Sequence, residues 1–130
     1  MSVLIDDSDA LVQYNSPSGW IVTGVVPEFE LTTHASATPG DTATLAFEGT
    51  SISVYGSIAE NTGQSKLNFS IAGAVVGSYQ APEVTRAIHN VLFWTSPVLA
   101  EASHQLVVTV DQDSSQDSSD RSVFLDYFVY

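Results

Sequence analysis

Several aromatic side chains stand where they could stack on the apolar C–H face of a pyranose ring. Trp20 lies in the irregular segment 16–20, where no core periodicity demands an aromatic, and Trp94 ends an apolar run. Tyr55 falls among serines on the polar face of an alternating segment, and Tyr14 and Tyr79 are further candidates. We predict stacking platforms at Trp20, Tyr55, Tyr79 and Trp94. The alternative is that the tryptophans are core or rim aromatics, since Trp is highly buried on average.

Sugar hydroxyls also need planar polar partners, which amide and guanidinium groups supply. Four such residues lie in or beside irregular stretches, and we predict that they contact a glycan: Asn61, Gln64, Arg86 and Asn90. Arg86 is one of only 3 basic residues and stands close to Glu83. An equally good interpretation of Arg86 is a surface ion pair worth under about 1 kcal/mol.

The residues give little support to catalysis. The three histidines, His34, His89 and His104, are scattered, and the chain has no Gly-x-Ser-x-Gly elbow, His-x-x-x-His pair or glycine-rich phosphate cradle. Two carboxylates about 5 Å apart could hydrolyse a glycoside, but spacing along the chain does not place them. We predict a non-catalytic protein.

The elements that must position these side chains are strands. Period-two alternation recurs between turn-forming clusters, at residues 42–47, 51–58, 67–71, 89–94, 105–110 and 123–130. We expect residues 48–50 to join the first two of these as a tight hairpin. About eight or nine strands at this spacing are typical of one all-β domain over residues 1–130, an antiparallel β-sandwich or jelly roll.

The last segment, 123–130, is apolar on both faces. Such a run belongs at the centre of a sheet that is covered on each side or that packs against another module. It therefore gives a reason to expect a homo-oligomer.

The amino-acid composition argues against several classes of binding partner. The chain has 130 residues, a formal net charge of −12 and no cysteine. This charge works against nucleic-acid backbones and anionic membranes, and disulfides are excluded. No apolar run approaches the length of a membrane span, and the first residues lack the pattern of a signal peptide. The single sequon, at Asn68, is weak evidence for secretion because one match arises readily by chance.

Several segments together resemble a known family. They are Ile5-Asp6-Asp7-Ser8-Asp9, Gly19-Trp20, the run from Pro39 through Phe47-Glu48-Gly49-Thr50-Ser51-Ile52-Ser53-Val54-Tyr55-Gly56, and Phe124-Leu125-Asp126-Tyr127. The chain resembles the extracellular β-sandwich domain of fungal, especially basidiomycete, secreted and membrane proteins. That domain in turn is similar to the galactose-binding-like jelly rolls of carbohydrate-binding modules. The resemblance implies a secreted or extracellular module that binds glycans.

The resemblance also implies a structural calcium ion, because such jelly rolls commonly hold one between acidic residues at the two ends of the chain. The matching residues here are Asp6, Asp7 and Asp126. Adjacent aspartates in a regular strand point to opposite faces, so we expect at most one of the first two to reach Asp126. Asp126 itself should lie between Phe124 and Phe128 on one strand face, where its carboxylate needs a partner. The acidic run 111–120 lacks the glycine and glutamate of a calcium loop, and we interpret it as a solvated loop.

These observations predict a lectin-like carbohydrate-binding module that recognises neutral glycans. A different class remains open: a structural adhesion, protein-interaction or immunomodulatory secreted domain whose aromatics are simply core. Titration with soluble glycans separates the two.

Overall fold

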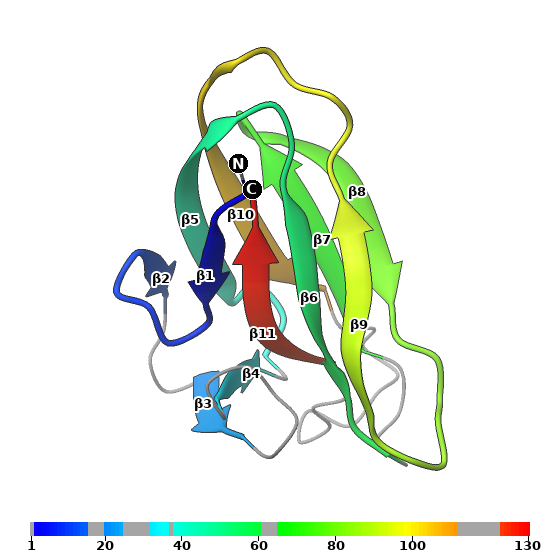
Figure 1. Cartoon of the computed structure of the whole chain (residues 1–130). Helices are drawn as coiled ribbons and strands as arrows, with labels where there is room; N and C mark the ends of the chain where they lie inside the picture. The colour runs from blue at the N-terminus through cyan, green and yellow to red at the C-terminus, as the bar shows by residue number, and fades with distance from the viewer. Residues whose placement is uncertain (1, 16–19, 25–31, 37, 61–64, 112–122) are drawn as a thin grey trace.

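The computed structural model describes residues 2–15, 20–24, 32–36, 38–60, 65–111 and 123–130. These residues form eleven strands and no helix, which confirms the all-β prediction (Figure 1). The strands are β1 (Leu4–Asp6), β2 (Val12–Tyr14), β3 (Trp20–Thr23), β4 (Thr33–Ser36), β5 (Thr42–Gly49), β6 (Ser53–Ile58), β7 (Lys66–Ile71), β8 (Ala74–Gln80), β9 (Ile88–Thr95), β10 (Ala102–Val110) and β11 (Val123–Val129). Four of them, β1 to β4, have only three or four residues and so show too little alternation to be predicted. Within the described segments there is no helix long and apolar enough to cross a membrane.

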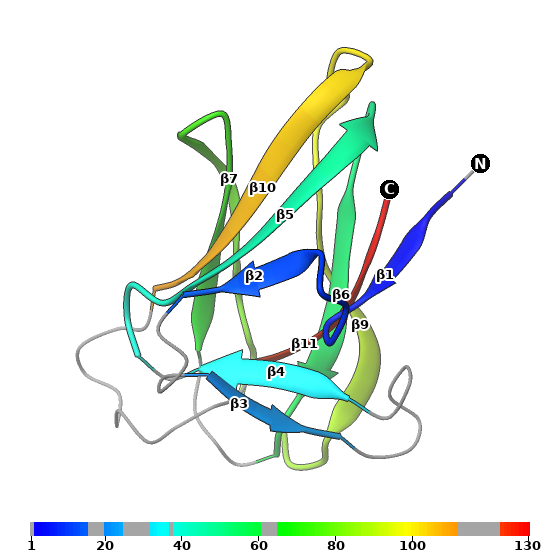
Figure 2. The same cartoon turned by 90° about the vertical axis from the view of Figure 1, so that its left-hand side faces the viewer.

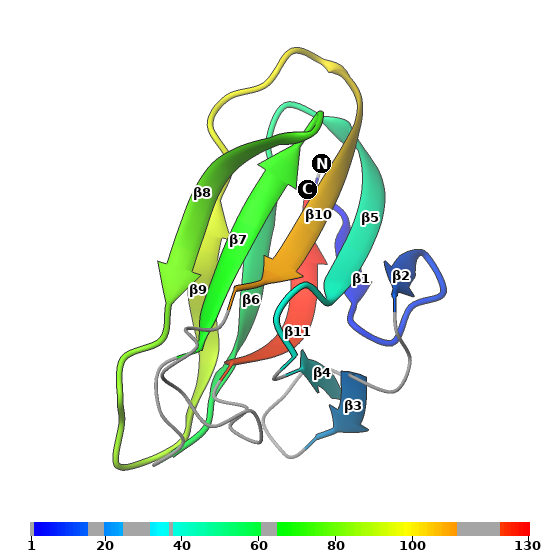
Figure 3. The ribbon, with the colours of Figure 1, turned by 180° about the vertical axis from the view of Figure 1, so that it is seen from behind.

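The strands form two antiparallel sheets that face each other. Sheet A has the order β3-β4-β11-β6-β9, with β1 also paired to β11, and sheet B has the order β2-β5-β10-β7-β8. Figures 1 and 3 show the two sheets from opposite sides. Figure 2 shows β3 and β4 together at the end of the molecule opposite the two chain termini. The predicted β-sandwich is therefore confirmed, and β11 lies at the centre of sheet A as its apolar sequence indicates.

The predicted hairpin at residues 48–50 is wrong. β5 pairs with β2 and β10 in sheet B, whereas β6 pairs with β9 and β11 in sheet A, so the connection crosses from one sheet to the other. Alternation fixes which face of each strand is apolar but not which strand is its neighbour. The crossing is held by the loop after β9, since Leu99 N donates to Thr50 O at 2.7 Å and Ser96 N donates to Ile52 O at 2.8 Å.

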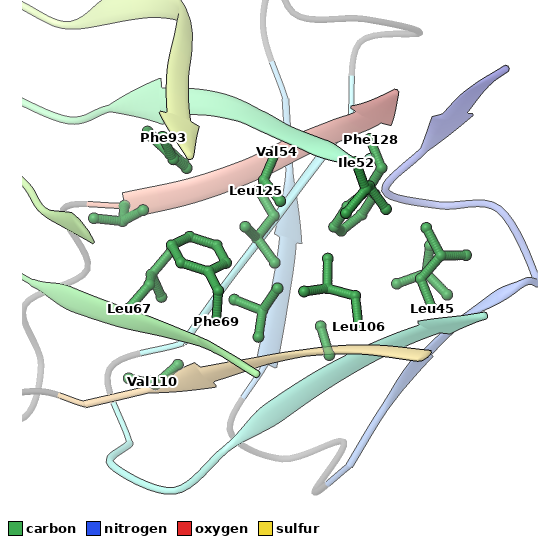
Figure 4. Packing of buried hydrophobic residues seen from close by; sticks show 14 of the residues in the cluster. Leu45, Ile52, Val54, Leu67, Phe69, Phe93, Leu106, Val110, Leu125 and Phe128 are labelled. Atoms are coloured by element: carbon green, nitrogen blue, oxygen red, sulfur yellow. The ribbon is translucent and has the colours of Figure 1, made fainter. Parts of the chain in front are cut away.

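The core fills the space between the sheets (Figure 4). Leu45, Phe69 and Leu106 project from sheet B, and Leu125 and Phe128 project from sheet A, each at 1 % exposure or less. Burying a side chain of this size contributes about 1.5–3 kcal/mol. With no cysteine in the chain, this packing specifies the fold.

Aromatic pairs close the sandwich along the edge where β8 and β9 meet. Trp94 stacks on Phe69 with ring centroids 4.7 Å apart, and Tyr79 stacks on Phe93 at 4.8 Å. Gly77 leaves room for the indole, because a Cβ there would lie 2.1 Å from Trp94 Nε1. These rings therefore hold the two edge strands together.

Candidate functional site

The outer face of sheet A carries aromatic side chains that face away from the core. Tyr55 of β6 and Tyr127 of β11 are directly paired, half-buried neighbours. Their ring centroids are 4.8 Å apart and their planes lie 11° from parallel. Each ring thus covers one face of the other. Burial raises the pKa of Tyr127, and the neighbouring Tyr55 and Asp126 act in the same direction, so its hydroxyl stays protonated at neutral pH.

The next row of the same face forms a small pocket. Phe124 of β11 lies opposite Ser57 of β6, and Ser57 Oγ is 2.9 Å from His89 Nδ1 of β9. These three residues line a pocket of about 150 Å³ together with residues of β3 and β4. We call the outer positions Tyr55, Tyr127, Ser57, Phe124 and His89 the tyrosine face.

The outer face of sheet B has a different composition. The residues of β5, β7 and β10 that alternate with the buried ones are mostly small or polar, and they include Thr42, Thr44, Ala46, Asn68, Ser70, Gln105, Val107 and Thr109. None of these eight is aromatic. The two outer faces of the sandwich therefore offer a ligand different chemistry, and in the described part of the chain the tyrosine face is the one that carries a stacked pair of tyrosines.

Three predicted platforms lie in other surroundings. Trp20 is 8 % exposed and packs on Tyr14 with ring centroids 4.9 Å apart, so it is a core aromatic and offers no ring face to a sugar. Trp94 and Tyr79 are partly exposed, but each uses one ring face to close the edge between β8 and β9. The structure does not bring these three residues onto the tyrosine face.

The predicted polar contacts divide into two groups. Asn61 and Gln64 lie outside the described residues. Arg86 is exposed and directly precedes Ala87 of the pocket, and Asn90 is exposed and directly follows His89. Neither of the two ion pairs in the described part of the chain involves Arg86, so the alternative interpretation, a surface ion pair, is not observed there. Asn90 has a positive φ of 56°, a conformation that asparagine tolerates better than most residues.

A separate acidic cluster joins the two ends of the chain. Asp6, Asp7 and Asp126 each place a carboxylate oxygen so that all three lie within 4.8 Å of one another, and all are buried. The expectation that only one of the first two reaches Asp126 is wrong, because β1 ends at Asp6 and strand alternation no longer governs Asp7. Asp7 N instead donates to Asp126 O at 2.8 Å.

Asp126 occupies a β-bulge. The pairing of β11 with β6 shifts between Leu125 and Tyr127, which leaves Asp126 as the extra residue. The prediction that Asp126 lies between Phe124 and Phe128 on one strand face is therefore wrong. Because of the bulge, Phe124 lies on the tyrosine face and Phe128 lies in the core. A bulge re-aims a side chain in this way without interrupting the sheet.

The residues of the cluster fit a hard cation such as calcium. Asp6 Oδ1 is buried without a hydrogen-bond partner among the described residues, and a buried carboxylate oxygen needs one or a cation. Burial raises the pKa of Asp7, although hydrogen bonds from His34, with Nδ1 2.6 Å from Oδ2, and from Thr32, with Oγ1 2.7 Å from Oδ1, oppose the rise. Carboxylate oxygens are among the ligands that calcium prefers. Asp6, Asp7 and Asp126 would hold such an ion, which would neutralise their charge and tie β1 to β11.

Several residues of these sites were not predicted. The sequence analysis did not name Tyr127 and Phe124 as binding residues. Ser57 and His89 are 32 positions apart in the sequence, and the pairing of β6 with β9 brings them together. His34 and Thr32 belong to a short strand and its approach, where alternation gives no signal. One signal was present for Ser57, because it shares the outer face with Tyr55 two residues earlier.

Comparison with known proteins shows the fold. No protein-family model and no curated protein matches the sequence. Among solved structures, a family 35 carbohydrate-binding module from Clostridium thermocellum matches with a TM-score of 0.67 at 12 % identity, over 99 % of this chain and 96 % of that one. A two-domain esterase active on acetylated mannans matches with a TM-score of 0.72 at 16 % identity, over 99 % of this chain and 35 % of the esterase. A family 36 module in complex with calcium and xylotriose matches with a TM-score of 0.56 at 15 % identity, over 97 % of each chain. The chain thus has the jelly-roll sandwich fold of these modules.

Proposed function

We propose that this protein is a non-catalytic carbohydrate-binding module that holds neutral glycans on the tyrosine face. The observation that carries the proposal is the contrast between the two outer faces, of which one bears stacked tyrosines beside a pocket and the other bears mainly small polar residues. The fold shared with carbohydrate-binding modules supports the same conclusion.

The chemistry of binding follows from the ring geometry. The aromatic surface of the tyrosine pair packs against the C–H face of a sugar ring, and tyrosine hydroxyls exchange hydrogen bonds with sugar hydroxyls. Arg86 and Asn90, exposed beside the pocket residues, supply further polar contacts. A single site of this kind binds weakly, so useful avidity requires several copies, and we extend the proposal to a homo-oligomer.

Charge and burial set the limits of the proposal. The net charge of −12 disfavours uronate-rich glycans and nucleic acids, which leaves neutral oligo- and polysaccharides. The carboxylates that lie close together, Asp6, Asp7 and Asp126, are 5 % exposed or less, out of reach of a glycosidic bond. They suit a structural calcium ion, and we infer that the module works in calcium-containing extracellular surroundings.

Binding of mannan, xylan and β-glucan oligosaccharides, measured by isothermal titration calorimetry and affinity electrophoresis, tests the proposal. Tyr55→Ala should weaken binding of the preferred glycan about tenfold, because the variant loses one ring contact and the surface that this contact buries. Tyr55→Phe should keep most of the affinity, because the ring face remains.

Gln105→Ala is the matched control, since Gln105 is exposed on the outer face of sheet B. Equal loss in Gln105→Ala and Tyr55→Ala, or no glycan binding by the wild type, would refute the proposal. A defined oligomer that ignores every glycan would instead favour an adhesion or protein-interaction module.

A further inference from the structure

The pocket of the tyrosine face has a mainly apolar lining, which does not suit an unsubstituted sugar hydroxyl. Each strand along the path β3-β4-β11-β6-β9 contributes to it, with Thr23, Thr33, Phe124, Ser57 and His89, and Ala87 lines it from the loop before β9. No Asp, Glu, Lys or Arg lines it within the described part of the chain. A volume of about 150 Å³ is enough for a small substituent.

The polar groups of the pocket are largely directed at each other. Ser57 Oγ and His89 Nδ1 form a hydrogen bond of 2.9 Å, and Thr33 Oγ1 donates to Thr23 O at 3.4 Å. Groups that are already paired offer little to an incoming hydroxyl, whereas an apolar group displaces water from such a lining at no cost in hydrogen bonds. The pocket therefore favours a neutral, methyl-bearing group over a hydroxyl or a carboxylate.

The pocket lies within one sugar unit of the stacked tyrosines. Ser57 follows Tyr55 by two residues on β6, and Phe124 and Tyr127 are their respective partners on β11. Two residues along a strand span about 7 Å, which is close to the width of one pyranose ring with its substituent. A sugar that contacts the tyrosine pair can thus direct a substituent into the pocket.

We propose that this pocket selects glycans that carry a methyl-terminated substituent, either an O-acetyl ester or the methyl group of a 6-deoxy sugar. The inference rests on the proposed function and narrows it to a class of decorated glycans. Burying one methyl group in the pocket strengthens binding about fourfold.

Two matched ligand pairs test the proposal and separate the two sources of the methyl group. The first pair is acetylated and deacetylated mannooligosaccharide, and the second is oligosaccharide ending in L-fucose or in L-galactose. The wild type should bind the methyl-bearing member of at least one pair about fourfold more tightly, as measured by calorimetry. The pair that shows this preference identifies the source.

Two variants fill the pocket and one serves as a control. Ala87→Leu and Thr23→Leu both replace exposed lining residues, and each should abolish the preference while the plain glycan still binds. Ala100→Leu, an exposed alanine of another loop, should keep it. Circular dichroism shows whether each variant is folded. If one filling variant misfolds, the other still tests the proposal.

The outcomes for the two proposals differ. Glycan binding without any preference in either pair, or a preference that survives both filling variants, overturns the methyl-selective pocket and leaves the proposed function standing. Failure of every glycan to bind overturns both.

Discussion

Two glycines permit the close packing behind the tyrosine face and at the sandwich edge. A Cβ at position 56 would lie 2.0 Å from the backbone oxygen of Phe124 and 2.5 Å from a ring carbon of Phe93. At position 77 the nearest atom is Trp94 Nε1, at 2.1 Å, which belongs to a side chain. Backbone moves less readily than a side chain, so the two glycines should differ in how far they tolerate substitution.

We predict that Gly56→Ala lowers the free energy of unfolding by about 3 kcal/mol, because it forces β6 away from β11, whereas Gly77→Ala costs about 1–2 kcal/mol. Urea denaturation of both variants and the wild type measures the difference. Trp94→Phe should relieve part of the cost of Gly77→Ala, since the smaller ring frees the space. The same or a smaller loss in Gly56→Ala than in Gly77→Ala would show that the space behind β6 is not limiting.

At the scale of single elements, the β7–β8 hairpin contains a strained residue. Its turn residues Ala72 and Gly73 have φ values of 56° and 80°. Positive φ at both positions is typical of a type I′ turn, in which asparagine followed by glycine is preferred. Glycine adopts this conformation freely, but alanine pays for its Cβ at a cost of about 1 kcal/mol.

We therefore predict that Ala72→Asn stabilises the protein by about 0.5–1 kcal/mol, because asparagine tolerates the left-handed region better than alanine. The gain should appear as a higher midpoint in thermal and urea unfolding. Ala74→Asn is the control, since Ala74 is equally exposed but outside the turn and has no positive φ. Stabilisation by both variants would indicate a general surface effect, and stabilisation by neither would contradict the turn argument.

Sequence alternation predicted these elements only in part. It predicted the alternating segment 42–47 and placed Tyr55 on the polar, outward face of its strand, because the side chains of a strand point to alternate sides whatever its neighbours are. It did not reveal that β5 and β6 belong to different sheets, since pairing depends on contacts distant in sequence. The bulge at Asp126 and the burial of Trp20 in a four-residue strand were equally beyond it, because each results from tertiary packing.

For the candidate site, the sequence identified individual residues and missed their assembly. The resemblance supplied Asp6, Asp7 and Asp126, which the structure brings together. Tyr55 was identified from its serine neighbours, but its partner Tyr127 lay in a run read as core, and the Ser57–His89 contact depends on the pairing of β6 with β9. Face assignment was thus predictable from local sequence, whereas the pocket required the topology.

At the scale of the whole molecule, the acidic cluster links the first strand to the last. β1 pairs only with β11, over three residues, and Tyr130 N donates to Val3 O at 2.9 Å beyond that ladder. Such a short strand contributes few backbone hydrogen bonds of its own. Charge repulsion among three buried carboxylates should therefore decide how firmly the N-terminal strand is held.

We predict that calcium raises the free energy of unfolding of chelator-treated protein, by about 2.7 kcal/mol when its concentration is one hundred times the dissociation constant. Differential scanning calorimetry with and without calcium measures the shift in the unfolding midpoint. Magnesium at the same concentration should act less, because it demands a smaller and more regular ligand shell. Asp126→Asn should remove the calcium response, and Asp111→Asn, at an exposed position, should keep it. A midpoint indifferent to calcium, or an equal response in both variants, would mean that the acidic cluster is not a calcium site and that the N-terminal strand is held without a metal ion there.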